Sequence, residues 1–283
     1  VNKENYKSSL ENEERGKEMV KIGKMSQADL AQLTAQRAQD EYSIVESESN
    51  VKNYKRQLKE LLQITNDEAF DIVVPTASDA QALGTIPSLN SVYASALDTR
   101  PEIKSYQNMI DQSDLNIAIA KAGKLPTISA NAGISTSTTS MNKDGWGSQI
   151  KQNFGVGGGI SVSIPICDNR ATKTAINKAN IQKQSSMLDL KDQQTKLYST
   201  IENYWLQANT NQSQFKAAKT STESAKTSYD LLSEQFKLGL KNIVELRTGK
   251  DNLLKAQQNE LQSKYLTLLN MGMLNFYKTG RVE

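Results

Sequence analysis

The chain of 283 residues contains no histidine and a single cysteine, Cys167. Imidazole and thiolate groups are the usual ligands of protein-bound zinc and, with serine, supply most nucleophile–base pairs in covalent catalysis. A lone thiol cannot form a disulfide within the chain. We therefore expect no metal centre, no cofactor and no enzymatic activity, and we expect Cys167 to be a small apolar filler at the end of a strand.

Long apolar runs, aromatic residues and clustered positive charge are also scarce. No apolar run approaches 18 residues, so the sequence predicts no transmembrane helix, and a membrane-spanning form of this chain requires a barrel. Lys and Arg are scattered among Asp and Glu to a net charge of +3, which argues against a nucleic-acid partner. A content of 37% hydrophobic and 6% aromatic residues is low for a thick core and typical of long, thin helices.

Glycine and proline are missing from Lys24–Val74 and from Asp168–Leu238. Apolar residues in these stretches recur at spacings of three, four and seven, which predicts long amphipathic helices with narrow coiled-coil stripes. Further helices are predicted for residues 1–22, for about Ile243–Tyr277, and from about residue 91 to Lys124 with a turn or fresh start at Arg100-Pro101. Asp71–Pro75 suggests a short extended segment.

The stretch from Leu125 to Ile166 alternates with a period of two instead. In its second half, large apolar residues share one face of a strand and small or polar residues share the other. The apolar set is Phe154, Val156, Ile160, Val162, Ile164 and Ile166. In the first half, Thr127, Ser129 and Asn131 oppose Ile128 and Ala130. The sequence therefore predicts a β-hairpin with a long polar loop at Met141–Gln152.

Two interpretations of this hairpin remain open. In a soluble or surface coiled-coil scaffold, the apolar face would be buried on the chain's own helices. In a transmembrane hairpin, the apolar face would meet lipid, while Thr127, Ser129, Asn131, Ser161 and Ser163 would line a wet lumen. Trp146 would then be a candidate for an aromatic girdle.

An internal repeat surrounds two glycines. Gly23–Leu30 aligns with Gly239–Leu246 at an offset of 216 residues (239 minus 23). Glycine permits the left-handed end of one helix, and Ser26 or Asn242 can cap the next, with Asp29 or Glu245 in its first turn. Each site is predicted to be a tight helix–turn–helix tip. Because a β-hairpin and about 70 helical residues precede only the second tip, we expect the full-length protein to contain a matching upstream part.

Several short motifs carry a family resemblance. They are Arg100-Pro101-Glu102, Leu125-Pro126-Thr127 leading into Ala132-Gly133, Ser163-Ile164-Pro165-Ile166 with Asp168-Asn169-Arg170, and Phe236-Lys237-Leu238-Gly239 followed by Glu245-Leu246. In their order and spacing, the chain resembles TolC-type outer membrane efflux proteins. It departs from them at Cys167, where an aromatic residue is usual.

The resemblance implies a mainly α fold with a β-hairpin. Long antiparallel coiled-coil helices would form a periplasmic α-barrel, and the strands would join a transmembrane β-barrel completed by trimerisation. The implied protein is an outer membrane channel of a tripartite efflux or type I secretion system. Its implied partners are two further copies, outer membrane lipid, a periplasmic adaptor and an inner-membrane pump.

The predicted organisation follows the same scheme. Residues 1–63 form the first tip hairpin, 64–97 an equatorial region, 98–125 a short helix of the α-barrel and 126–167 the transmembrane hairpin. Residues 168–279 form the second, long helical hairpin, and 280–283 are a C-terminal tail.

The resemblance also assigns the candidate site residues. The adaptor-contact residues at the tips are Gly23, Lys24, Met25, Ser26, Gly239, Leu240, Lys241 and Asn242. The entrance gate is assigned to Asp29, Lys241 and Glu245, where an acid and a base would link neighbouring coils. In the plainer interpretation these residues only build the turns and the solvated first turns of helices.

Overall fold

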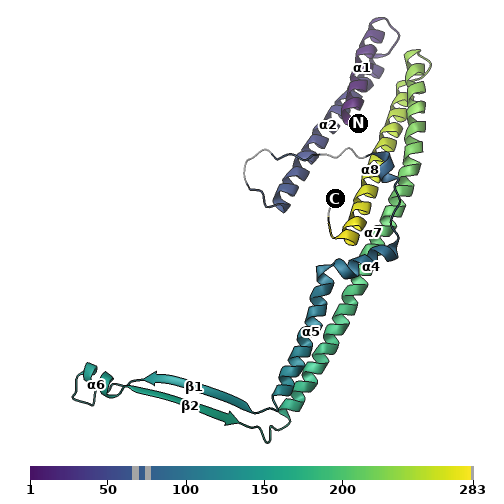
Figure 1. Cartoon of the computed structure of the whole chain (residues 1–283). Coiled ribbons are helices and arrows are strands. Elements are labelled where there is room, and N and C mark those ends of the chain that lie inside the picture. The colour runs from purple at the N-terminus through teal and green to yellow at the C-terminus, as the bar shows by residue number, and fades with distance from the viewer. Residues whose placement is uncertain (66–69, 74–77, 282–283) are drawn as a thin grey trace. The chain divides into compact units, whose positions relative to one another are not determined.

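The computed structural model describes residues 1–65, 70–73 and 78–281, which are mainly helical with one two-stranded sheet (Figure 1). The chain divides into two compact units. The first comprises residues 1–92 and 201–283, and the second residues 93–200. Helix α7 contributes residues to both. In the part of the chain that is described, no helix has the length and apolar character to cross a membrane.

The first unit contains two antiparallel helical hairpins. One pairs α1 (Asn2–Lys21) with α2 (Gln27–Leu61), and the other pairs the C-terminal part of α7 (Ala171–Lys237) with α8 (Ile243–Thr279) (Figure 1). The predicted long helices are confirmed. Gly280, with φ +73°, ends α8 in the left-handed conformation.

The carboxylate of Asp79 binds the short helix α3 (Asp79–Ala82) to the α7/α8 hairpin. Asp79 lies 2.7 Å from Lys219 Nζ of α7 and 2.9 Å from Lys264 Nζ of α8. Hydrogen bonds from these two ammonium groups lower the pKa of Asp79 to about 2, so this carboxylate stays ionised at neutral pH. Gln212 of α7 also donates to the carbonyls of Ala82 and Gly84. These contacts hold the segment that follows the predicted extended piece. Residues 71–73 of that piece have no regular structure, and 74–75 lie outside the described residues.

A buried ion pair joins the two helical hairpins. Lys250 Nζ of α8 lies 2.5 Å from Asp40 Oδ2 of α2, with side-chain exposures of only 6% and 9%. The same ammonium donates to Ser9 Oγ and to the carbonyl of Asn5 in α1, and Gln36 donates to the other oxygen of Asp40. Removing one partner of such a pair would leave an uncompensated buried charge, which costs about 3–5 kcal/mol.

In the second unit, α5 (Pro101–Ala122) packs on the N-terminal part of α7. Pro101 occupies the first helical position, as predicted, directly after α4 (Leu89–Thr99). Lys183 Nζ binds the carboxylate of Asp114 at 2.7 Å, and the hydroxyls of Ser113 and Ser186 lie 3.3 Å apart. The unit therefore has polar as well as apolar contacts between its helices, as expected from a chain poor in large apolar residues.

The predicted β-hairpin is present as β1 (Thr127–Ser135) and β2 (Gly155–Ser163). Its antiparallel register pairs Ile128 with Val162 and Ala130 with Ile160 on one face. On the other face it pairs Thr127 with Ser163 and Ser129 with Ser161. Ile128, Val156 and Ile160 are 72%, 75% and 79% exposed, so the helices of the same unit leave the apolar face uncovered.

Both ends of the hairpin differ from the prediction. The strands are nine residues long and stop before Ile164 and Pro165, because proline has no N–H to donate to the ladder. The long polar loop predicted at Met141–Gln152 contains helix α6 (Trp146–Gln152). Buried Gln149 folds this loop by accepting from the backbone N–H of Thr139 at 2.8 Å and donating to the carbonyl of Asp144 at 2.7 Å.

Both helical hairpins contain a close contact between a glycine and a leucine, but the glycine lies on the first helix of one hairpin and on the second helix of the other. In the first, a Cβ on Gly16 of α1 would lie 2.6 Å from Leu33 Cδ1 of α2. In the second, a Cβ on Gly249 of α8 would lie 2.6 Å from Leu232 Cδ1 of α7. The repeat offset maps Gly16 onto Leu232 and Leu33 onto Gly249. One close helix contact is thus built twice, with glycine and leucine on opposite partners.

Because the glycine and leucine have opposite places in the two hairpins, a second substitution should restore the stability lost by a first one. Gly249→Leu should lower the free energy of unfolding by about 1–3 kcal/mol, because it forces a second leucine into the contact. Adding Leu232→Gly recreates the arrangement of the first hairpin. The cost of glycine in α7 is then offset by its removal from α8. We expect the double variant to regain most of the loss in urea denaturation followed by circular dichroism. A double variant no more stable than Gly249→Leu would contradict the exchange.

Candidate functional site at the helical tips

The two tips are built by the same local chemistry. Gly23 and Gly239 adopt φ values of +72° and +75°, the left-handed conformation that glycine reaches without steric cost. Ser26 Oγ then accepts from the backbone N–H of Asp29 at 3.0 Å, and Asn242 Oδ1 accepts from that of Glu245 at 2.9 Å. The turn and cap chemistry predicted from the repeat is therefore confirmed at both tips.

An apolar cluster brings the tips together. Leu33 of α2, Phe236 of α7, and Ile243 and Leu246 of α8 are buried against one another, with Met25 and Tyr229 at the edge. The hydroxyl of Tyr229 lies 3.1 Å from that of Ser8 in α1. Phe236, which the sequence places among the apolar anchors of its long helix, lies in the cluster that joins the hairpins.

A hollow of about 430 Å³ lies between the tips. Residues from both turns line it, and they include six of the predicted site residues: Lys24, Met25, Asp29, Gly239, Lys241 and Asn242. Gly23, Ser26 and Leu240 are exposed at the same turns, and Glu245 is one helical turn beyond Lys241. The structure thus gathers the residues predicted to contact an adaptor or to form a gate at one end of the first unit.

The charged groups at the tips bind local partners. Lys241 Nζ lies 2.5 Å from Glu245 Oε1, four residues along the chain, and this hydrogen bond lowers the pKa of Glu245. Asp29 accepts from Ser26 Oγ at 2.7 Å. Asp29 and Lys241 line the same hollow, but each bonds to a residue of its own tip. The reason is that a suitable partner lies three or four residues away along the chain, within reach of the side chain. A link between neighbouring coils through these residues stays a prediction.

The Lys250–Asp40 pair is the feature that the sequence analysis missed. Asp40 follows Leu33 by seven residues and Lys250 follows Leu246 by four, so both charges fall on the buried faces of their helices. A charged residue at an apolar position of a helix is the sequence signal from which a buried ion pair could have been predicted. Glu13 of α1 is another buried charged residue with charged partners. Hydrogen bonds from Lys17 and Thr34 and the positive charge of Arg37 lower the pKa of this carboxyl group.

The surface at the tips combines apolar, backbone and charged groups. In the described ranges, His, Cys, Asp and Glu side chains do not gather into a group able to hold a metal ion. The tips offer an apolar floor at Phe236 and Ile243, exposed backbone at two glycines, and lysine and carboxylate groups at the rim.

Characterised relatives are similar along most of the chain. Outer membrane efflux protein BepC of Brucella suis is 23% identical over 262 residues, which cover 92% of this chain and 54% of the relative. Toxin and drug export protein A of Aggregatibacter actinomycetemcomitans is 22% identical over 85% of this chain and 50% of its own length. The chain spans about half the length of the curated relatives it matches.

Solved structures share the fold. The structure of CusC matches with a TM-score of 0.78 at 16% identity, covering 98% of this chain and 63% of that one. The Campylobacter jejuni CmeC outer membrane channel matches with a TM-score of 0.71 at 19% identity, covering 99% and 58%. The predicted combination of long helices and a β-hairpin is thus the fold of these channels.

The family model described as outer membrane efflux protein matches residues 92–271, which is more than half of the chain. This match includes the β-hairpin, the whole of α7 and most of α8. The chain therefore belongs to the outer membrane efflux protein family.

Proposed function

We propose that this chain is part of a passive, trimeric outer membrane channel in a tripartite efflux or type I secretion system. The observation that carries the proposal is the β-hairpin. In a family of outer membrane efflux proteins, it presents one uncovered apolar face of Ile, Val and Ala, interrupted at Gly158, and one face of Ser, Thr, Asn and Gly. Membership in this family also agrees with the prediction that the chain is not an enzyme.

The hairpin is proposed to supply two strands of a barrel. Its apolar face would meet outer membrane lipid, and its small polar face would line a water-filled lumen. Unpaired strand edges are not tolerated in hydrocarbon, so further strands, from other parts of the full-length protein and from two further copies, would close the barrel. The helices would extend the channel into the periplasm.

The tips are proposed to bind a periplasmic adaptor, which would connect the channel to an inner-membrane pump. Residues 23–26 and 239–242 would make this contact, because they expose backbone and side chains on both sides of the hollow. The similar proteins are named for the efflux of toluene or antibiotics and for toxin and drug export. The proposed cargo is of these kinds, with selection left to the pump, since the hairpin's polar face carries only generic polar groups.

The entrance gate is proposed to involve Asp29, Lys241 and Glu245. All three lie at the tips, and Asp29 and Lys241 line the hollow between them. An exposed ion pair contributes only about 0–1 kcal/mol, so a gate of this kind would depend on several copies acting together.

Conductance in planar lipid bilayers tests the channel and its gate. We expect the full-length protein to form discrete, mostly closed pores. Asp29→Ala should raise the open-to-closed ratio by at most about fivefold per copy, the equivalent of 1 kcal/mol. The control Asp251→Ala removes an exposed carboxylate of α8 that does not line the hollow. Absence of any pore activity would contradict the channel, and a closed state unaltered in Asp29→Ala would contradict the gate.

Adaptor docking is tested at the turn glycine. Gly239→Val places a β-branched side chain at a positive φ, at a cost of roughly 1–2 kcal/mol, and fills the exposed turn. We expect cross-linking to the adaptor and drug resistance to be lost while trimers persist. The matched control is Gly272→Val, at a position in α8 with open space around the new side chain. Cross-linking and resistance retained in Gly239→Val would contradict docking at the tips.

A further inference from the structure

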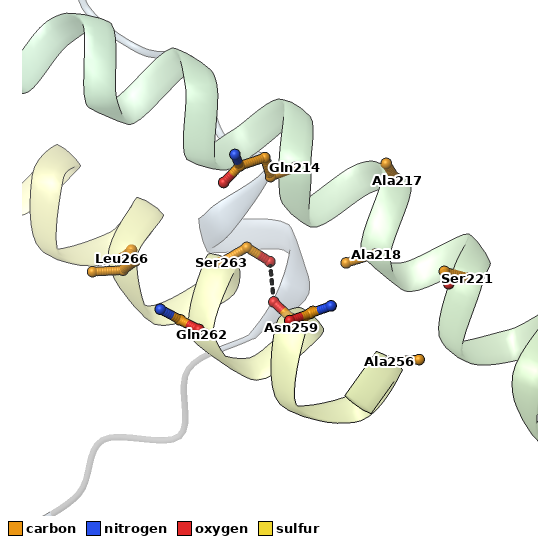
Figure 2. A pocket seen from close by; sticks show the side chains of 9 residues that line it. All are labelled: Gln214, Ala217, Ala218, Ser221, Ala256, Asn259, Gln262, Ser263 and Leu266. Carbon is orange, nitrogen blue, oxygen red and sulfur yellow. Dashed lines mark hydrogen bonds between the residues drawn. The ribbon is translucent and has the colours of Figure 1, made fainter. Parts of the chain in front are cut away.

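Charge is unevenly distributed along the helices. A hollow of about 450 Å³ between α7 and α8 is lined by nine residues, none of which has an ionisable side chain (Figure 2). The segments that connect the helices to the β-hairpin are different. Residues 115–135 and 155–180 contain five basic side chains and one acidic side chain, Asp168, which is a net charge of +4 in a chain whose total is +3. The net positive charge of the chain is therefore concentrated where its helices meet the hairpin.

Packing brings four of these basic residues together. A Cβ on Gly123, at the end of α5, would lie 3.4 Å from Thr172 Oγ1, in the first turn of α7. Two basic residues lie within two positions of Gly123 and two within two positions of Thr172, and all four are exposed. We call them the basic cluster: Lys121, Lys124, Arg170 and Lys173. The cluster thus combines positive charge from both connections between the helices and the hairpin.

The charges of the basic cluster are not neutralised by the chain. The acidic residue beside it, Asp168, accepts from the backbone N–H groups of Arg170 at 3.1 Å and Thr172 at 2.8 Å. Among the described residues, no carboxylate forms an ion pair with any of the four basic side chains. Farther along the same two helices, by contrast, Lys183 binds Asp114 at 2.7 Å. The basic cluster is therefore free to bind negative charge from outside the chain.

The backbone at Arg170 is strained. Its φ is +65°, in the left-handed region that a residue with a Cβ occupies at a steric cost. Within the described ranges, no hydrogen bond or ion pair of the guanidinium offsets this cost. Backbone strain of this kind concentrates at functional sites. Here the strained turn presents a positive charge at a position that glycine would occupy at lower cost.

Exposed apolar side chains lie between the basic cluster and the strands. Leu125, Ile164 and Ile166 are 62%, 64% and 97% exposed. From the strands to the helices, the surface therefore changes from an apolar face to exposed apolar side chains at the connections and then to positive charge. Lysine and arginine at the end of a membrane-spanning element place their apolar stems at the edge of the hydrocarbon and their charged ends among the headgroups. This order of surfaces fits the edge of a lipid leaflet.

We propose that the basic cluster binds the phosphate headgroups of anionic phospholipids in the periplasmic leaflet of the outer membrane. This inference rests on the proposed function, in which the hairpin spans the membrane and the helices lie in the periplasm. The connections between helices and hairpin are then level with the headgroups of that leaflet. Each lysine or arginine close to an anionic membrane surface strengthens binding about fivefold, so the cluster selects anionic over zwitterionic phospholipid.

Lipid binding to the full-length protein in neutral detergent tests the cluster. In native mass spectrometry, we expect phosphatidylglycerol to bind more tightly than phosphatidylcholine with the same acyl chains. Lys124→Gln combined with Arg170→Gln removes two charges and should weaken phosphatidylglycerol binding about 25-fold, with phosphatidylcholine binding unchanged. The matched control is Lys104→Gln combined with Lys191→Gln, which changes two exposed lysines of the same helices about 30 Å from the cluster and should bind lipid as the unaltered protein does.

A glycine at position 170 separates binding from folding. Because glycine takes a positive φ freely, Arg170→Gly should keep or raise the melting temperature in lipid-free detergent. The same variant should weaken phosphatidylglycerol binding about fivefold. A lower melting temperature would make Arg170 a structural residue and overturn its place in the basic cluster.

The outcomes also separate this inference from the channel itself. Conductance of the same samples in planar bilayers reports whether a channel exists. Equal binding of the two phospholipids, or equal loss of binding in the control, with conductance retained would overturn the lipid site and leave the channel standing. Loss of lipopolysaccharide binding instead of phosphatidylglycerol binding would assign the cluster to the other leaflet and overturn the proposal. An absence of conductance would overturn the channel and this inference together.

Discussion

Side chains of a β-strand alternate between two sides, and in this hairpin the alternation separates isoleucine and valine from serine, threonine and glycine. Each buried side chain of this kind is worth about 1.5–3 kcal/mol relative to water. The helices of the same unit leave those side chains uncovered. In the proposed function, the lipid of the outer membrane covers them.

The helical part satisfies a different constraint. Its helices are long and poor in large apolar residues, so packing depends on small, specific contacts. A Gly–Leu contact is used in each helical hairpin, a cluster of four buried apolar residues joins the tips, and the Lys250–Asp40 pair joins the hairpins farther from the tips. Each contact is local, and each leaves other faces of the helices free.

Sequence patterns predicted the elements well, for reasons visible in particular residues. Glycine and proline are absent from residues 171–237, and one helix of 67 residues spans that range. Gly23 and Gly239 marked both turns because only glycine takes a positive φ there at no cost. Helix α6 was missed because its loop is folded by the side chain of Gln149, a contact that composition does not reveal. The Lys250–Asp40 pair was missed because its partners are 210 residues apart. The domain boundaries and the roles of the tip residues stay predictions.

The proposed channel requires alternate residues of β2 to face lipid and water. It is tested most directly by thiol accessibility in the full-length protein in lipid vesicles. In a Cys167→Ser background, Ser161→Cys should react readily with a membrane-impermeant maleimide, because it faces the wet lumen. Ile160→Cys, one residue away, should react at least tenfold more slowly, because it faces hydrocarbon. Equal rates at the two positions, or faster reaction at position 160, would contradict the account.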